Sequence, residues 1–190
     1  MELGNDMDWA VHVRAYPGAP RGGDAGIVIP AGDDGALAVL IDAAGHGLAA
    51  YVVAQKARET VYAHPDAEPD ELLQRLDERL RGTTGAAVSI GRLRGRELSF
   101  AGVGNVQASV SLRPLLVRVG IVGVRMRQPK VVRVALEEKA WFIMHTDGVS
   151  SPDALPGGSA KTVAAALVEK FGSMSDDAAV LALRWRGSAI

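Results

Sequence analysis

The stretch Leu37-Ala38-Val39-Leu40-Ile41-Asp42-Ala43-Ala44-Gly45-His46-Gly47 changes character halfway along. Its first five residues are apolar without alternation, which predicts a central β-strand covered on both faces. After Gly47 alanines and valine recur at helical spacing, which predicts a helix that ends at His64-Pro65. Asp42 therefore stands at the end of a buried strand, beside glycines that let the backbone approach a ligand closely.

Three further aspartates stand at similar breaks: Asp24 follows two glycines, Asp147 precedes Gly148, and Asp176 precedes a second acid. Each adjoins an apolar stretch of strand-like composition. Carboxylates that converge at strand ends repel one another unless protons or cations neutralise them. Oxygen-only ligation suits hard ions such as Mg²⁺ or Mn²⁺. An aspartate beside glycine is also a common turn former, but the ordered set of four favours a di-metal hydrolytic centre.

The composition indicates one domain, residues 1–190, with no separate regulatory domain. Hydrophobic residues make up 48% of the chain and aromatic residues 5%, so the core is expected to be aliphatic. A net charge of -1 argues against a general polyanion binder, and we expect no nucleic-acid partner. Arginines gather at 92–96 and 125–127, and we interpret both groups as solvated turns.

The chain contains no cysteine, which excludes a disulfide framework, a thiolate nucleophile and a Cys-ligated zinc site. This fits a reducing compartment. The acidic start, residues 1–6, lacks the basic and apolar regions of a signal peptide. No apolar stretch reaches the ~20 residues that span a bilayer. We therefore expect a cytoplasmic monomer without a membrane partner.

Hydrophobic periodicity predicts helices over residues 47–64, from about 69 to 81, and 159–171. A turn is predicted at 32–35. Helices in separate blocks between runs of hairpin-linked strands are typical of an α+β fold, with helices layered on antiparallel sheet. The predicted strands are 9–15, 25–30, 36–41, 86–90, 97–101, 106–111, 115–119, 131–136, 139–145 and 178–185.

The motifs are ordered as Gly-Asp at 23–24, Asp-x-x-Gly-x-Gly at 42–47, Gly-Val-Gly-Asn at 102–105, Thr-Asp-Gly at 146–148 and Asp-Asp at 176–177. This order resembles the PPM (protein phosphatase 2C-like) serine/threonine phosphatases. Within them it is similar to the bacterial sporulation and stress-response branch, most of all to its RsbX-type stressosome phosphatases. The resemblance implies an αββα sandwich, two antiparallel sheets face to face and flanked by helices.

The resemblance also implies two Mn²⁺ or Mg²⁺ ions, with Mn²⁺ favoured and a third ion possible in this family. Asp42 would bridge the two ions, and the carbonyl of Ala43 would serve one of them. Asp147 and Asp176 would complete the second ion's sphere, while Asp24 would bind a metal or a metal-bound water. The activated water would attack the phosphoester directly, with no phosphoenzyme.

Further residues near these motifs are candidates for supporting roles. Asp177 would orient its neighbour or a water. His46 either protonates the leaving oxygen or serves structurally as a helix cap, and Arg21 either steers a phosphate or is a plain loop residue. Asn105 and Gly148 lie within the family motifs. Where the late motif often carries Thr, this chain has Ala179, which removes a hydroxyl from the surroundings of Asp176.

By resemblance, the function is dephosphorylation of phosphoserine or phosphothreonine on stressosome scaffold and STAS-domain proteins, which resets a bacterial stress-signalling pathway. Two alternatives stay open. One is a non-catalytic adaptor of the same fold that binds phosphoproteins. The other is a hydrolase of a small phosphoester, although no phosphate-cradling G-x-x-x-x-G-K-[ST] motif supports a nucleotide site.

Overall fold

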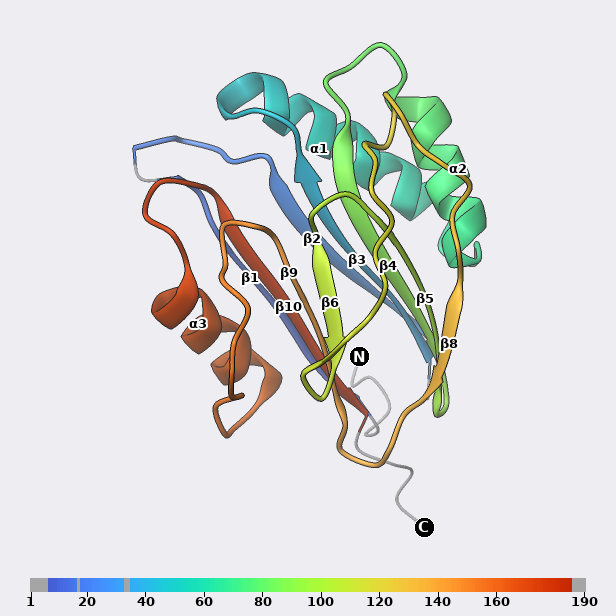
Figure 1. The fold of residues 1–190 in the computed structure, drawn as a ribbon, viewed down its shortest axis with the longest axis vertical. Helices are drawn as coiled ribbons and strands as arrows, with labels where there is room; N and C mark the ends of the chain where they lie inside the picture. The colour runs from blue at the N-terminus through green and yellow to red at the C-terminus, as the bar shows by residue number, and fades with distance from the viewer. Residues whose placement is uncertain (1–6, 17, 33–34, 186–190) are drawn as a thin grey trace.

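The computed structural model describes residues 7–16, 18–32 and 35–185 (Figure 1). The acidic start of the chain and Asp33-Asp34 of the predicted turn lie outside these residues. The elements of the described part are β1 (Met7–Arg14), β2 (Asp24–Ala31), β3 (Gly35–Ala43), α1 (Gly47–Ala63), α2 (Pro69–Leu80), β4 (Ala86–Arg94), β5 (Glu97–Val103), β6 (Gln107–Val110), β7 (Arg113–Pro114), β8 (Val132–Ala135), β9 (Trp141–His145), α3 (Ala160–Phe171) and β10 (Ala178–Trp185).

The described strands form two five-stranded sheets, ordered β1-β10-β9-β6-β7 and β2-β3-β4-β5-β8. Neighbouring strands in both sheets run antiparallel. Helices α1 and α2 cover the outer face of the second sheet, and α3 covers the outer face of the first (Figure 1). The predicted αββα sandwich is confirmed.

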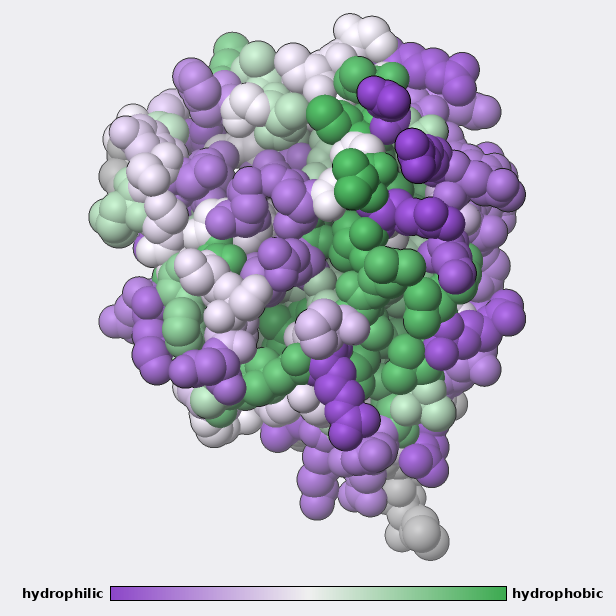
Figure 2. Space-filling view, in the orientation of Figure 1, coloured by the Kyte–Doolittle hydropathy of each residue, from purple (hydrophilic) through white to green (hydrophobic). Residues whose placement is uncertain are grey.

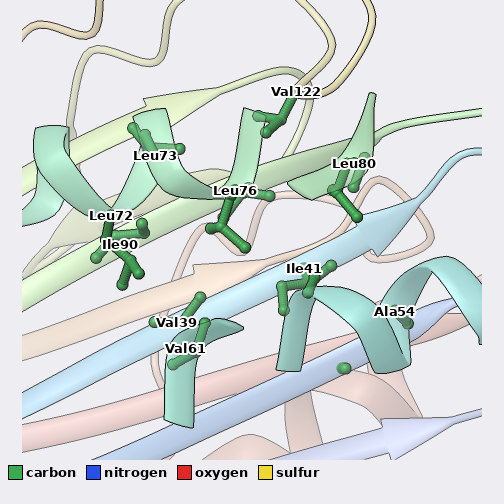
Figure 3. Close-up of a cluster of buried hydrophobic side chains, with 14 of the residues drawn as sticks. Val39, Ile41, Ala54, Val61, Leu72, Leu73, Leu76, Leu80, Ile90 and Val122 are labelled. Carbon is green, nitrogen blue, oxygen red and sulfur yellow. The ribbon is translucent and has the colours of Figure 1, made fainter. Parts of the chain in front are cut away.

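Strand β3 shows how the sequence produces these layers. Alternate side chains of the strand point to opposite faces. Leu37, Val39 and Ile41 belong to the core beneath the helices, whereas Ala38 and Leu40 belong to the core between the two sheets. Figure 3 shows Val39 and Ile41 facing the leucines of α2. The unbroken apolar run is therefore the signature of a strand buried on both faces, as predicted.

Helix α2 packs through one apolar stripe, Leu72, Leu73, Leu76 and Leu80, all fully buried. Its first position is Pro69, which lacks only an N–H that would have no helical partner. In α3, the hydroxyl of the N-cap residue Ser159 accepts a hydrogen bond from the amide of Thr162 in the first turn. No helix of the described residues is both long and apolar enough to cross a membrane.

The predicted strand at 115–119 is wrong. Only Arg118 forms an isolated bridge, in which its backbone exchanges hydrogen bonds with Gly102 and Gly104. Apolar composition predicted a strand, but the backbone then turns at Gly123, whose φ of 89° strongly favours glycine. The chain from β7 to β8 therefore crosses the open edge of the sandwich instead of extending a sheet (Figure 1).

The interpretation of residues 92–96 as a solvated turn is wrong for Arg92. This side chain is 3% exposed, and its guanidinium donates to the carbonyl oxygens of Pro65 and Ala67. These carbonyls lie in the connection between α1 and α2. Arg92 therefore ties that connection to β4, while Arg94, two residues on, pairs with Glu68 at the surface.

We expect Arg92→Met to lower the free energy of unfolding by about 2–3 kcal/mol, because loop carbonyls lose a charged donor. Chemical denaturation measures the change. Arg94→Met is the matched control in the same strand, with an expected loss below about 1 kcal/mol for an exposed pair. Equal losses in the two variants would contradict this role of Arg92.

Candidate metal centre

Asp24 and Asp42 face each other across two neighbouring strands. They are direct partners in the antiparallel register of β2 and β3. All positions of β3 are buried except Asp42, which is half-buried near the end of the strand. Adjacent strand positions thus hold two carboxylates close together at one edge of the second sheet.

The first sheet contributes Asp147, which follows β9. Next to it, the hydroxyl of Thr146 donates to Asp24 Oδ2 at 2.8 Å and accepts from the amide of Ala179 at 3.0 Å. A single buried hydroxyl therefore fixes the first sheet against the carboxylate of the second. The sequence reasoning missed Thr146, although the Thr-Asp-Gly motif contained the signal.

Asn105 lies between two of the acidic side chains. Its Nδ2 donates to Asp147 Oδ2 at 2.6 Å, and its hydrogen bond to Asp42 favours the ionised form of that carboxyl. The preceding Gly104 has φ 103°, and a Cβ there would overlap Ala87. The Gly-Asn turn therefore places a neutral amide among the carboxylates.

Asp177 is buried and anchors the segment that leads into Asp24. Its carboxylate accepts from the amide of Tyr16 at 2.7 Å and of Gly23 at 2.6 Å. A side chain at Gly22 would strike this carboxylate. The amide of Asp177 in turn donates to Asp176 Oδ1 at 2.8 Å, so the exposed Asp176 is oriented by its neighbour's backbone.

Of the remaining predicted residues, Ala43 and Gly148 pack against the segments that carry these carboxylates, whereas Arg21 contacts helix α1. The carbonyl oxygen of Ala43 lies close to Gly23, where an added Cβ would come within 2.9 Å of it. Gly148 packs against the Asp177 carbonyl so closely that a Cβ would overlap it. The guanidinium of Arg21 stacks on Tyr51, 4.5 Å from the ring centre.

His46 occupies the N-cap position of α1, but its side chain makes no capping hydrogen bond. The side chain is exposed. His46 therefore occupies the predicted cap position, but its imidazole contributes no hydrogen bond to the helix. It lines a cavity of about 690 Å³ together with Tyr16, Gly18, Ala19, Gly45, Gly47, Ser175, Asp176 and Asp177.

A second cavity, of about 340 Å³, reaches the group past Asp42 and Asn105. Its other lining residues come from the connections after β3 and after β5, from β4 and from the chain between β7 and β8. They are Ala44, Ala87, Gly104, Val119, Gly120 and Ile121.

Burial and like charge together raise the pKa values of the two facing carboxyls, Asp24 and Asp42. Burial is the main reason that the pKa of Asp24 rises from 3.8 to about 8, and the charge of Asp42 adds to the shift. Burial likewise raises the pKa of Asp42 to about 7, followed by the charge of Asp147. Asp176 and Asp177 add smaller contributions to both. Without a cation, the site therefore favours the protonated, neutral forms of Asp24 and Asp42 up to near-neutral pH.

This donor set fits hard divalent cations, because every convergent group is a carboxylate or carbonyl oxygen. In the described part of the chain, no three acidic or histidine side chains are already oriented as a closed metal-binding cluster. Asp24 and Asp147 instead direct oxygens at Thr146 and Asn105. The charge of Asp42 raises the pKa of Asp24, and that of Asp147 raises the pKa of Asp42, while hydrogen-bond donors hold Asp24 and Asp147.

Comparison with known proteins agrees with this geometry. The family model for stage II sporulation protein E (SpoIIE) matches residues 32–186. No curated protein matches the chain. Among solved structures, a chain described under "The bacterial stressosome: a modular system that has been adapted to control secondary messenger signaling" has 25% identity and a TM-score of 0.86, covering 95% of this chain and 100% of that one.

Two further structures share the fold. RsbX in complex with magnesium has 21% identity and a TM-score of 0.86, covering 97% of this chain and 98% of its own. The catalytic domain of the serine/threonine phosphatase PstP in complex with 2 manganese ions has 15% identity and a TM-score of 0.76, covering 94% and 98%. The chain therefore belongs to the SpoIIE family, and it shares the fold of the metal-dependent PPM (PP2C-like) protein phosphatases.

Proposed function

We propose that this chain removes phosphate from phosphoserine or phosphothreonine on stressosome scaffold and STAS-domain proteins. The observation that carries the catalytic part is the convergence of Asp24, Asp42, Asp147 and Asp176 from two sheets onto one site. The partner class is supported by the similarity to RsbX and to the stressosome-related chain, both matched along nearly their whole length.

Asp42 would hold two Mn²⁺ or Mg²⁺ ions between the sheets, and the carbonyl of Ala43 would contact one of them. Asp147 and Asp176 would complete the second ion's ligands, and Asp24 would contribute a ligand or orient a water. A pair of divalent cations lowers the pKa of a shared water and neutralises phosphate oxygens. Mn²⁺ is the favoured ion, and a third ion is possible.

The other residues would hold and orient these ligands. Thr146 fixes Asp24, Asn105 fixes Asp147, and the backbone of Asp177 orients Asp176. His46 is exposed in the cavity that Asp176 lines, where an imidazole can deliver a proton to the departing serine or threonine oxygen. Water would attack phosphorus in line, so positioning and electrostatics would supply most of the rate.

The proposed reaction resets a binding surface on the partner. Removing a phosphate deletes roughly -1.5 to -2 charges and three strong acceptor oxygens. A STAS-domain protein would thereby regain the surface that its unphosphorylated form presents. The phosphatase would act as a monomer consisting of one domain.

We expect Asp42→Asn and Asp147→Asn to lower turnover of a phosphorylated STAS-domain protein by about 100-fold or more, the scale of losing one preorganised electrostatic group. Phosphate release with Mn²⁺ is the measurement. Asp153→Asn, an exposed loop aspartate, serves as the control and should keep wild-type turnover. Binding without phosphate release would favour the adaptor. Preferential hydrolysis of nucleotides or p-nitrophenyl phosphate would favour a small-ester hydrolase.

The raised pKa values predict that the metal-free protein loses stability as pH rises. The fold keeps protons on Asp24 and Asp42 up to pH about 7–8, whereas the unfolded chain releases them near pH 4. Stability from these groups is therefore full below about pH 4 and declines up to about pH 8. In chelator, we expect the melting temperature to fall by several degrees from pH 6 to 8, with ~2–4 °C per kcal/mol.

Mn²⁺ or Mg²⁺ should restore more of the melting temperature at pH 8 than at pH 6, because the cations bind ionised carboxylates. Asp24→Asn removes the main titrating group and should flatten the decline in chelator. A melting temperature that is independent of both pH and cations would show that the carboxylates do not share one electrostatic site.

A further inference from the structure

The residues between β6 and β8, 111–131, combine positive charge with exposed apolar side chains. This basic segment contains no aspartate or glutamate, although the whole chain carries a net charge of -1. Figure 2 shows apolar and strongly hydrophilic atoms side by side on the face where Figure 1 draws the segment. Its cations are Arg113, Arg118, Arg125, Arg127 and Lys130, all exposed.

Among the described residues, no carboxylate lies within ion-pair distance of any of these five cations. Other arginines at the surface of this protein, such as Arg75, Arg79 and Arg94, have acidic partners. The basic segment therefore presents positive charge that no acidic side chain of the described part compensates.

Large apolar side chains are exposed in the same segment. Val119 is 90% exposed, Val124 59%, Leu116 56% and Ile121 41%. Contiguous exposed apolar groups rimmed by polar ones are typical of sites where another molecule binds.

The backbone beneath these side chains is firmly held. Arg118 exchanges two hydrogen bonds of 2.8 Å with Gly102 and Gly104, and Val122 is fully buried and exchanges two with Ala86. The amide of Gly123 donates to Asp77 of α2 at 2.8 Å. The exposed side chains are thus attached to a backbone that hydrogen bonds already fix. This lowers the conformational entropy that would be lost on binding.

The basic segment borders the candidate metal centre directly. Val119, Gly120 and Ile121 line the same cavity as Asp42 and Asn105. A molecule seated on the basic segment therefore has one part within reach of the carboxylates. A lipid surface would cover that cavity, whereas a protein segment can extend a phosphorylated side chain into it.

We infer that the basic segment is the docking surface for the polypeptide around the phosphorylated residue. The side chains of Val119 and Ile121 would receive an apolar residue next to the phosphoresidue, and Arg118 and Arg125 would attract acidic residues farther along. Such cations also steer an anionic substrate toward a site that is itself rich in carboxylates. This inference rests on the proposed phosphoprotein substrate and specifies its sequence.

Two phosphoserine peptides test the inference. The first has leucine beside the phosphoserine followed by aspartates, and the second has alanine and asparagine at those positions. With Mn²⁺, we expect wild-type kcat/KM to favour the first by about 10-fold or more, as two exposed ion pairs and one apolar contact allow. The double variant Arg118→Ser with Arg125→Ser, and Val119→Ser separately, should each reduce this ratio, through KM.

Lys161→Ser is the control, because Lys161 is exposed on α3, on the outer face of the other sheet. It should keep the wild-type ratio. Equal kcat/KM for the two peptides, or an unchanged ratio in the docking variants, would overturn the inference.

Fluorescence anisotropy in chelator separates docking from catalysis, because binding is measured without turnover. Tighter binding of the first peptide, weakened in the docking variants, would support the docking surface. If phosphate release failed at the same time, only the proposed function would be rejected. Binding to vesicles of anionic lipid that the docking variants abolish, with no peptide preference, would assign the surface to membranes instead.

Discussion

The mutual repulsion of the acidic side chains is the constraint around which this fold is organised. Asp24 and Asp42 sit opposite each other in one sheet, and the other sheet brings Asp147 and Asp176 toward them. Packing between the sheets holds these groups together against their charge, since the core between the layers combines small alanines with fully buried leucines and phenylalanines. Part of the free energy that burial provides is thus offset by the cost of holding these carboxyl groups close together.

The hydrogen bonds around the site distribute this task over distant parts of the chain. The Thr146 hydroxyl links the sheets at Asp24, Asn105 adds a neutral amide at Asp147, and Asp177 holds the backbone before Asp24. None of these three donors or acceptors adds a positive charge. Each therefore orients a carboxylate or the backbone beside it without adding a cation that would compensate the negative charge.

Much of the fold was predictable because its signals are local. The continuous apolar run before Asp42 predicted a doubly covered strand, and the leucine spacing of α2 predicted the stripe that faces it. The convergence of the four aspartates was predictable from strand ends and motif order. The metal-binding roles assigned to them by resemblance stay predictions.

What could not be predicted depends on contacts across the sandwich. Residues 115–119 have strand composition, but no neighbouring strand is available to pair with them beyond one bridge. The burial of Arg92 depends on loop carbonyls 25 and 27 residues away. The link from Thr146 to Asp24 spans 122 residues. Spacing along the chain carries no information about such partners.

The pairing of β1 with β10 has a consequence for biogenesis. The segment before Asp24 is fastened by a residue 154 positions later, and the first described strand lies beside the last. During synthesis, a contact between residues this far apart can form only after the later residue has been added to the chain. A nascent chain that still lacks β10 therefore cannot complete the acidic site, and under the proposed function phosphate release would begin only after β10 has been synthesised. Proteolytic loss of β10 would likewise remove that activity while leaving Asp24, Asp42 and Asp147 in the chain.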